Sequence, residues 1–208
     1  MKAGAGGVKD LAVDPEKKGA NHARIIRSAL GLDCVKDEIL YNATIPLWDV
    51  YKGSRSERPM LVKLPHEAIA RDFYNHKTAY LAARADTDNV NVPAFLQHPF
   101  VQRHGASECW PIGYYTDKVK LANESFYRGS VKCSLMRTGI TVWLLKCSEL
   151  CRCGCNGLCT LDAIQLIMNS SINSLQRDTF PMSRHDNATW LDSETSSKHR
   201  AGKSIGFR

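Results

Sequence analysis

Five cysteines lie within thirteen residues, in the segment CSELCRCGCNGLC, and no other feature constrains the fold of this chain as strongly. They are Cys147, Cys151, Cys153, Cys155 and Cys159. Residues two apart in an extended chain point to the same side, so the middle three thiols can share one face. Two glycines in the segment allow a tight turn that folds the last cysteine back. The spacing therefore predicts that four or five sulfurs converge on one point.

Converging thiolates indicate a zinc site. Structural zinc takes four thiolate or imidazole ligands in a tetrahedron, with sulfur about 2.3 Å from the metal. We expect Cys151, Cys153, Cys155 and Cys159 to supply these ligands, with Cys147 as an alternative ligand. The usual C-x2-C knuckle is missing from the segment, which leaves two alternatives open. The thiols could form disulfides, or they could be reduced and have no chemical role.

The composition is that of a globular protein with a basic surface. A length of 208 residues with 43% hydrophobic residues suits one domain with a real core. The net charge of +7 favours an anionic partner, and nucleic acid is the commonest one. The alternative is a charge spread over an ordinary solvated surface. No motif indicates a small-molecule substrate.

Neither a secretory leader nor a membrane span is expected. The N-terminal residues lack an apolar h-region. The longest strongly apolar run, Ile140 to Leu145, is far shorter than the roughly 20 residues that cross a bilayer. We therefore expect an intracellular protein, nuclear or cytoplasmic, whose thiols stay reduced.

The hydropathy pattern predicts an α+β fold in four parts. Residues 1–22 form a disordered leader, and residues 23–109 form a mainly helical region. Residues 110–180 hold a sheet-plus-helix core with the cysteine cluster, and residues 181–208 form a polar tail without a core of its own. The abrupt end of this tail suggests a truncated protein.

The core consists of a small sheet packed by a helix. Strands are expected near residues 111–117, 130–136 and 140–146, so that the sheet spans about residues 111–146. A helix begins near Thr160, its expected N-cap. The apolar residues of this helix fall on one stripe that should face the sheet. They are Leu161, Ile164, Ile167, Met168 and Ile172.

Asp117 is the one candidate catalytic residue. It closes the strand-like segment PIGYYTD, and two-metal phosphoryl-transfer sites place a carboxylate at the end of a central strand. Such a site needs at least two further acids nearby, which the downstream sequence does not offer in a suitable context. The alternative is an ordinary aspartate at a strand end, and the chain alone is more consistent with a protein that is not an enzyme.

The segment WPIGYYTD, followed by SVKCSLMR, ITVWLLKC and CRCGCNGLC, resembles a multicopy family of uncharacterised proteins from dinoflagellate and related genomes. Members carry a P-I-G-x-x-x-D strand, two more strands, a C-R-C-G-C-x-G-x-C run and a helix. These correspond here to Pro111–Asp117, Ser130–Cys147, Cys151–Cys159 and Thr160–Leu175. The resemblance covers about a third of the chain and implies descent from a mobile-element, transposase-like protein.

Three functional hypotheses follow. The first is a zinc-stabilised domain of a mobile-element-derived protein that binds nucleic acid. The second is a fragment of an RNase H-like transposase or nuclease that uses Asp117 as a metal-binding acid. The third is an inactive relic. Two acids near Asp117 on a central strand would favour the second hypothesis, and Asp117 without them would favour the first.

Overall fold

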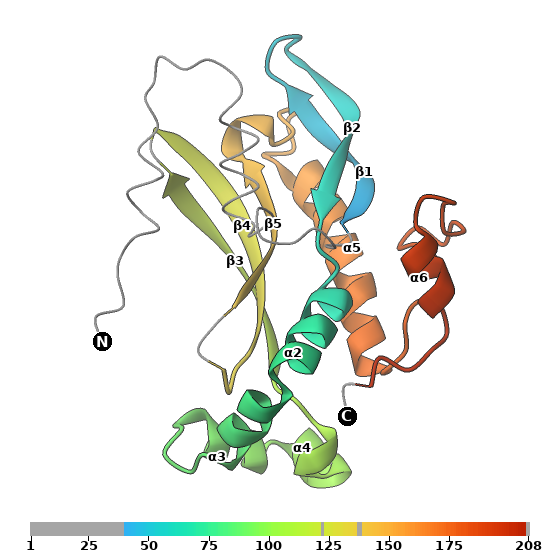
Figure 1. Cartoon of the computed structure of the whole chain (residues 1–208). Helices are drawn as coiled ribbons and strands as arrows, with labels where there is room; N and C mark the ends of the chain where they lie inside the picture. The colour runs from blue at the N-terminus through green and yellow to red at the C-terminus, as the bar shows by residue number, and fades with distance from the viewer. Residues whose placement is uncertain (1–39, 122, 137–138, 207–208) are drawn as a thin grey trace.

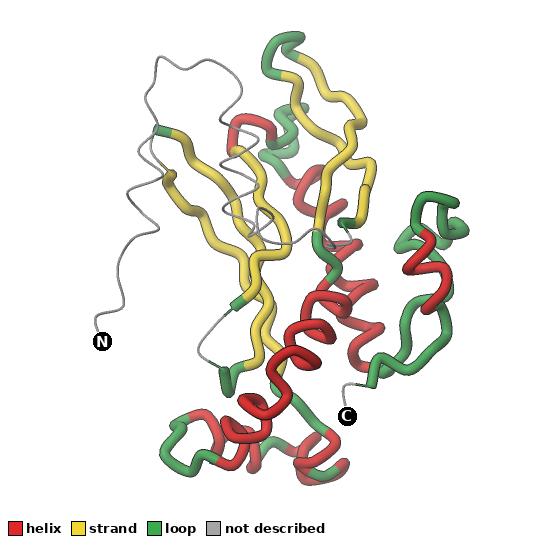
Figure 2. Tube along the Cα trace, viewed as in Figure 1, coloured by secondary structure: helices red, strands yellow, loops and turns green. Residues whose placement is uncertain are grey.

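The structure is a computed structural model and describes residues 40–121, 123–136 and 139–206. It combines two antiparallel sheets with helices and so belongs to the α+β class that the sequence predicts. The two sheets stand side by side, with the longest helices packed between and below them (Figures 1 and 2). The expected leader, residues 1–22, and residues 23–39 of the expected helical region lie outside the described residues. Among the helices that are described, none has the length and apolar character needed to cross a bilayer.

The first sheet is a hairpin of β1 (Tyr41–Asp49) and β2 (Ser54–Val62). Its turn is closed by the Asp49 carboxylate, which accepts two backbone N–H groups of the turn at 3.0 Å. The prediction of a mainly helical region over residues 23–109 is therefore wrong for this stretch. Pro46 and Pro59 obscured the strands, but each strand of a two-stranded sheet has one free edge where a proline needs no hydrogen-bond partner.

The second sheet contains three strands where the sequence predicts them, although the middle one begins six residues before its predicted start and ends three residues before its predicted end. It has the order β3 (Ile112–Leu121), β4 (Glu124–Cys133) and β5 (Ile140–Lys146), with both neighbouring pairs antiparallel. Trp143 pairs across the sheet with Gly129, where any Cβ would clash with the indole ring. The indole N–H donates to a tyrosine hydroxyl of β3 at 2.9 Å. This packing fixes the inner face of the sheet.

Three helices follow the hairpin: α2 (Pro65–Ala85), α3 (Asn91–Gln97) and α4 (Pro99–His104). Proline is the first residue of α2 and of α4, where its fixed φ suits a helix start and its missing N–H costs nothing. The three helices close a small core at the lower end of the molecule (Figure 1). Its buried members are Phe73, Tyr80, Val92, Phe95, Val101, Cys109, Cys133 and Leu135.

The helix α5 (Leu158–Gln176) crosses the main core. Three residues of the predicted stripe, Ile164, Ile167 and Met168, are buried, whereas the other two, Leu161 and Ile172, are only half-buried. The helix packs directly against α2 and β1, however, and not mainly against the three-stranded sheet as expected. The hairpin, which the sequence did not indicate, takes that place. The sheet reaches the same core through residues such as Trp143.

Residues after α5 are packed, although the sequence predicts a polar tail without a core. Trp190 and Ile205 are buried, and a short helix α6 (Thr195–Arg200) lies between them in sequence. Arg184 forms an ion pair with Glu194, stacks over a β1 tyrosine ring at 4.6 Å and donates to a β1 carbonyl at 2.8 Å. Paired charges and single large apolar residues hold this segment, and neither produces a periodic signal in the sequence.

Candidate metal centre

Four cysteines converge in the loop between β5 and α5. The sulfurs of Cys151, Cys153, Cys155 and Cys159 all lie within 4.8 Å of one another, and those of Cys153 and Cys159 are 3.7 Å apart. A tetrahedron with metal–sulfur bonds of about 2.3 Å has edges of about 3.8 Å. The four thiols can therefore hold a metal ion with only small side-chain movements. Within the described residues, no other group of three or more metal-ligating side chains is found.

The local backbone explains why these sulfurs meet. Gly154, Asn156 and Gly157 have positive φ values of 98°, 52° and 89°, which turn the chain sharply twice. The loop is closed by backbone hydrogen bonds from Gly157 N–H to the Cys151 carbonyl and from Leu158 N–H to the Cys155 carbonyl, each 3.0 Å long. Cys151 thereby lies beside the first turn of α5, which carries Cys159.

Thr160 anchors the loop and is not the N-cap that the sequence predicts; that position belongs to Gly157. The fully buried hydroxyl of Thr160 donates to the carbonyl of Pro46 at 2.6 Å and accepts the backbone N–H of Cys151 at 3.0 Å. One side chain therefore ties the helix, the cysteine loop and the hairpin together. The contact with Pro46 spans 114 residues of sequence, so sequence spacing alone gave no sign of it.

The thiols are electrostatically unequal. The backbone N–H of Cys159 donates to the sulfur of Cys155 and, together with neighbouring thiol donors, lowers the pKa of Cys155 to about 6. Hydrogen bonds with Cys155 and Cys153 raise the pKa of Cys159 to about 12, and burial raises the pKa of Cys151. A divalent cation would favour the deprotonated form of every ligand, because metal binding displaces thiol protons.

The site lies at the surface on one side and against the hairpin on the other. Cys151 is buried, whereas Cys153 is exposed. The guanidinium of Arg55, on β2, lies 3.8 Å from the sulfur of Cys159. A four-thiolate site with a divalent ion carries a net negative charge, and the nearby guanidinium offsets part of it.

The structure separates the other predicted residues from this group. Cys147 lies in a short 3-10 helix, Cys147–Glu149, and does not belong to the converging set. Asp117 lies in the middle of β3, an edge strand, where its carboxylate pairs with Arg128 at 2.6 Å. It belongs to no group of metal-ligating side chains in the described residues. Within the described residues, Asp117 therefore lacks the second and third acids that the nuclease hypothesis requires.

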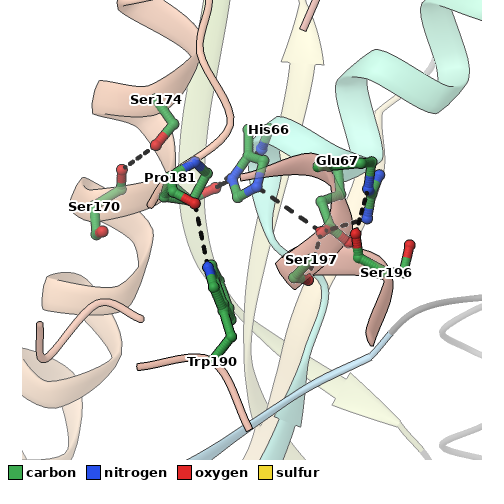
Figure 3. A network of polar contacts seen from close by, with 10 residues as sticks. His66, Glu67, Ser170, Ser174, Pro181, Trp190, Ser196 and Ser197 are labelled. Atoms are coloured by element: carbon green, nitrogen blue, oxygen red, sulfur yellow. Dashed lines mark hydrogen bonds and ion pairs between the residues drawn. The ribbon is translucent and has the colours of Figure 1, made fainter. Parts of the chain in front are cut away.

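A buried polar network around His66 was missed by the sequence reasoning. The Nδ1 atom of His66 lies 2.8 Å from the hydroxyl of Ser171. Its Nε2 atom lies 3.9 Å from the carboxylate of Glu67 (Figure 3). Serine, histidine and glutamate together suggest a hydrolase, but the cavity beside His66 has a volume of only about 10 Å³. Ser171 also accepts the backbone N–H of His66, so the contact fastens α2 to α5.

The sequence and the structure were compared with known proteins. No family model, curated protein or solved structure matches this chain. The resemblance to the mobile-element family therefore stays a prediction, and the site geometry carries the functional argument.

Proposed function

We propose that this protein is a zinc-stabilised domain in which Cys151, Cys153, Cys155 and Cys159 bind one structural zinc ion. The observation that supports the proposal is the set of four sulfurs within 4.8 Å of one another. An all-thiolate tetrahedral site selects zinc or iron and disfavours the hard cations magnesium and calcium. Four protein ligands leave no open position for a substrate or an activated water, which is the pattern of a structural site.

The zinc ion stabilises the junction between β5 and α5. The unfolded chain has no preformed site, so the free energy of metal binding adds to the free energy of folding. Cys151 is hydrogen-bonded to Thr160, and Cys159 contacts Arg55 of the hairpin. The metal is thereby coupled to the hairpin as well as to its own loop.

Elemental analysis of the purified, reduced protein tests the proposal directly. We expect one zinc per chain, and tetrahedral thiolate absorption bands when cobalt replaces zinc. Cys153→Ser and Cys155→Ser should each release the metal and lower the melting temperature. Cys147→Ser and Cys109→Ser are the matched controls and should retain it, because neither thiol belongs to the converging set. A stable, metal-free wild type would refute the zinc site, and bound iron would refute the choice of metal.

We further propose that the zinc-stabilised domain binds nucleic acid, as expected for a mobile-element-derived protein. The support is the net charge of +7 and two exposed arginines at the site, Arg55 on β2 and Arg152 in the cysteine loop. Binding should weaken steeply with salt, because each phosphate contact releases counterions, with a slope of about 0.9 per contact in log–log form. Arg152→Gln should lower this slope by about 0.9, while Lys198→Gln on α6 should leave it unchanged. Binding that is absent at low salt, or that does not depend on salt, would contradict the proposal.

A further inference from the structure

A cavity of about 710 Å³ lies on the far side of α2 from the small core of α2–α4. Its walls come from the first half of α2 and the two residues before it, the first residue of β5, Phe180 before α6, and the end of α6 with the segment that follows it. Tyr74 bounds it, with a hydroxyl that donates to the carbonyl of Ile205 at 2.9 Å. This volume falls within the range of about 300–1,000 Å³ that is typical of small-molecule sites.

The floor of the cavity is apolar. It is lined by Leu64, Ala68, Ala70, Ile140, Phe180 and Ile205. Ala70, Phe180 and Ile205 also form a small buried cluster, so the floor is a packed surface. The apolar surface left open to a ligand comes mainly from the half-buried Ala68 and Ile140, which lie beside this packed floor. It fits the apolar body of a ligand, because burying apolar surface stabilises a complex by about 25 cal/mol per Å².

The charged residues at the cavity are mostly cationic. They are Lys63, Arg71, Arg200 and Lys203, against the two acids Glu67 and Asp72. The Glu67 carboxylate already accepts from Arg200 at 2.8 Å and from the hydroxyl of Ser197 at 3.2 Å (Figure 3). The Asp72 carboxylate accepts from a tyrosine hydroxyl at 2.6 Å. Because hydrogen-bond donors already occupy both carboxylates, neither is available to bind a cationic group of a ligand.

Lys203 is the cation best placed to meet a ligand. Its ammonium group lies 3.5 Å from the imidazole of His199, and no carboxylate within the described residues pairs with it. A carboxylate, sulfonate or phosphate group at this end of the cavity would gain a direct ion pair.

We propose that this cavity binds an organic anion with an apolar body, with the apolar part against Ala68, Ile140 and the edge of Phe180 and the anionic group at Lys203. The site is independent of the cysteine centre, since none of the four clustered cysteines lines it. The ligand class is defined by both features together: an inorganic anion lacks the body, and a neutral hydrocarbon lacks the charge.

Fluorescence titration with a matched pair of dyes tests the proposal on the full chain. The anionic dye is 8-anilinonaphthalene-1-sulfonate, and N-phenyl-1-naphthylamine has the same rings without the sulfonate. We expect one sulfonate dye per chain, bound at least tenfold more tightly than the neutral dye. Decanoate and phenyl phosphate should each displace the sulfonate dye, and the ratio of their displacement constants shows whether the site prefers a carboxylate or a phosphate. Inorganic phosphate should not displace the dye.

Two variants locate the bound dye. Lys203→Gln should weaken binding of the sulfonate dye about tenfold and change binding of the neutral dye less than twofold. Lys52→Gln in the exposed hairpin turn is its matched control. Ala70→Leu fills the floor and should abolish binding, while Ala82→Leu, exposed on the same helix, should have no effect. Circular dichroism checks folding, and if Ala70→Leu does not fold, Lys203→Gln decides alone. Equal affinity for the two dyes, or binding unchanged in Lys203→Gln, would overturn the proposal.

Discussion

Replacing Thr160 by valine is the sharpest test of how the cysteine loop is held. Valine has nearly the shape of threonine but carries a methyl group in place of the hydroxyl, which is fully buried and makes two hydrogen bonds. The carbonyl of Pro46 loses a donor and the N–H of Cys151 loses an acceptor. A buried polar group left without a partner costs about 1–3 kcal/mol, so the two together should lower the free energy of unfolding by about 2–6 kcal/mol.

Thr160→Ser provides the matched comparison, because it keeps the hydroxyl and loses one methyl group, at a cost of about 1 kcal/mol. Urea denaturation of both variants gives the two values. Thr160→Val should also weaken zinc affinity by about 10–100-fold in competition with a chelator, as loss of an outer-shell hydrogen bond typically does. If Thr160→Ser were as destabilised as Thr160→Val, the packing of the methyl group and not the hydroxyl would hold the loop, and the reasoning would fail.

Three further predictions concern stability. Ile167→Ala, at a fully buried position of α5, should lower the unfolding free energy in urea by about 2–5 kcal/mol. Gly157→Ala should cost about 1–2 kcal/mol in the same assay and weaken metal binding, because φ is +89° there and a Cβ would lie 3.4 Å from the Leu150 side chain. Burial lowers the pKa of His66 from 6.5 to about 3, so the unfolded state binds the extra proton between these values. Stability should therefore be complete above pH 6.5 and fall by up to about 1.4 kcal/mol per unit toward pH 3. Burial raises the pKa of Glu67, which acts in the opposite direction, so the difference between wild type and His66→Gln isolates the histidine.

The sequence predicted those elements whose signal is local. The strands of the second sheet and the buried stripe of α5 follow from the periodicity of neighbouring residues. The hairpin was missed because Pro46 and Pro59 interrupt an alternation that is otherwise clear in β1, where Tyr41, Ala43 and Ile45 are all buried. Proline disfavours a strand in general, but not at the free edge of a two-stranded sheet.

The candidate site likewise has a local part that the sequence predicts and a long-range part that it does not. Four of the five proposed cysteines converge, since their spacing and the two glycines determine the loop. Cys147 is separated from them by a 3-10 turn, which the sequence did not indicate. The partners Thr160, Pro46 and Arg55 could not be predicted, because their contacts join segments about a hundred residues apart.

These long-range contacts determine how far the influence of a bound metal extends. The cysteine loop is connected to the hairpin through the buried Thr160 hydroxyl and through Arg55. The hairpin in turn supplies Ile45 and Leu47 to the core that α5 shares with the sheet. The cluster around Phe73 and the cavity beside α2 share no residue with the cysteine loop. A metal at the four cysteines would therefore act first on the hairpin and the start of α5, and would reach α2 only through the packing of α2 on α5 and the contact of His66 with Ser171.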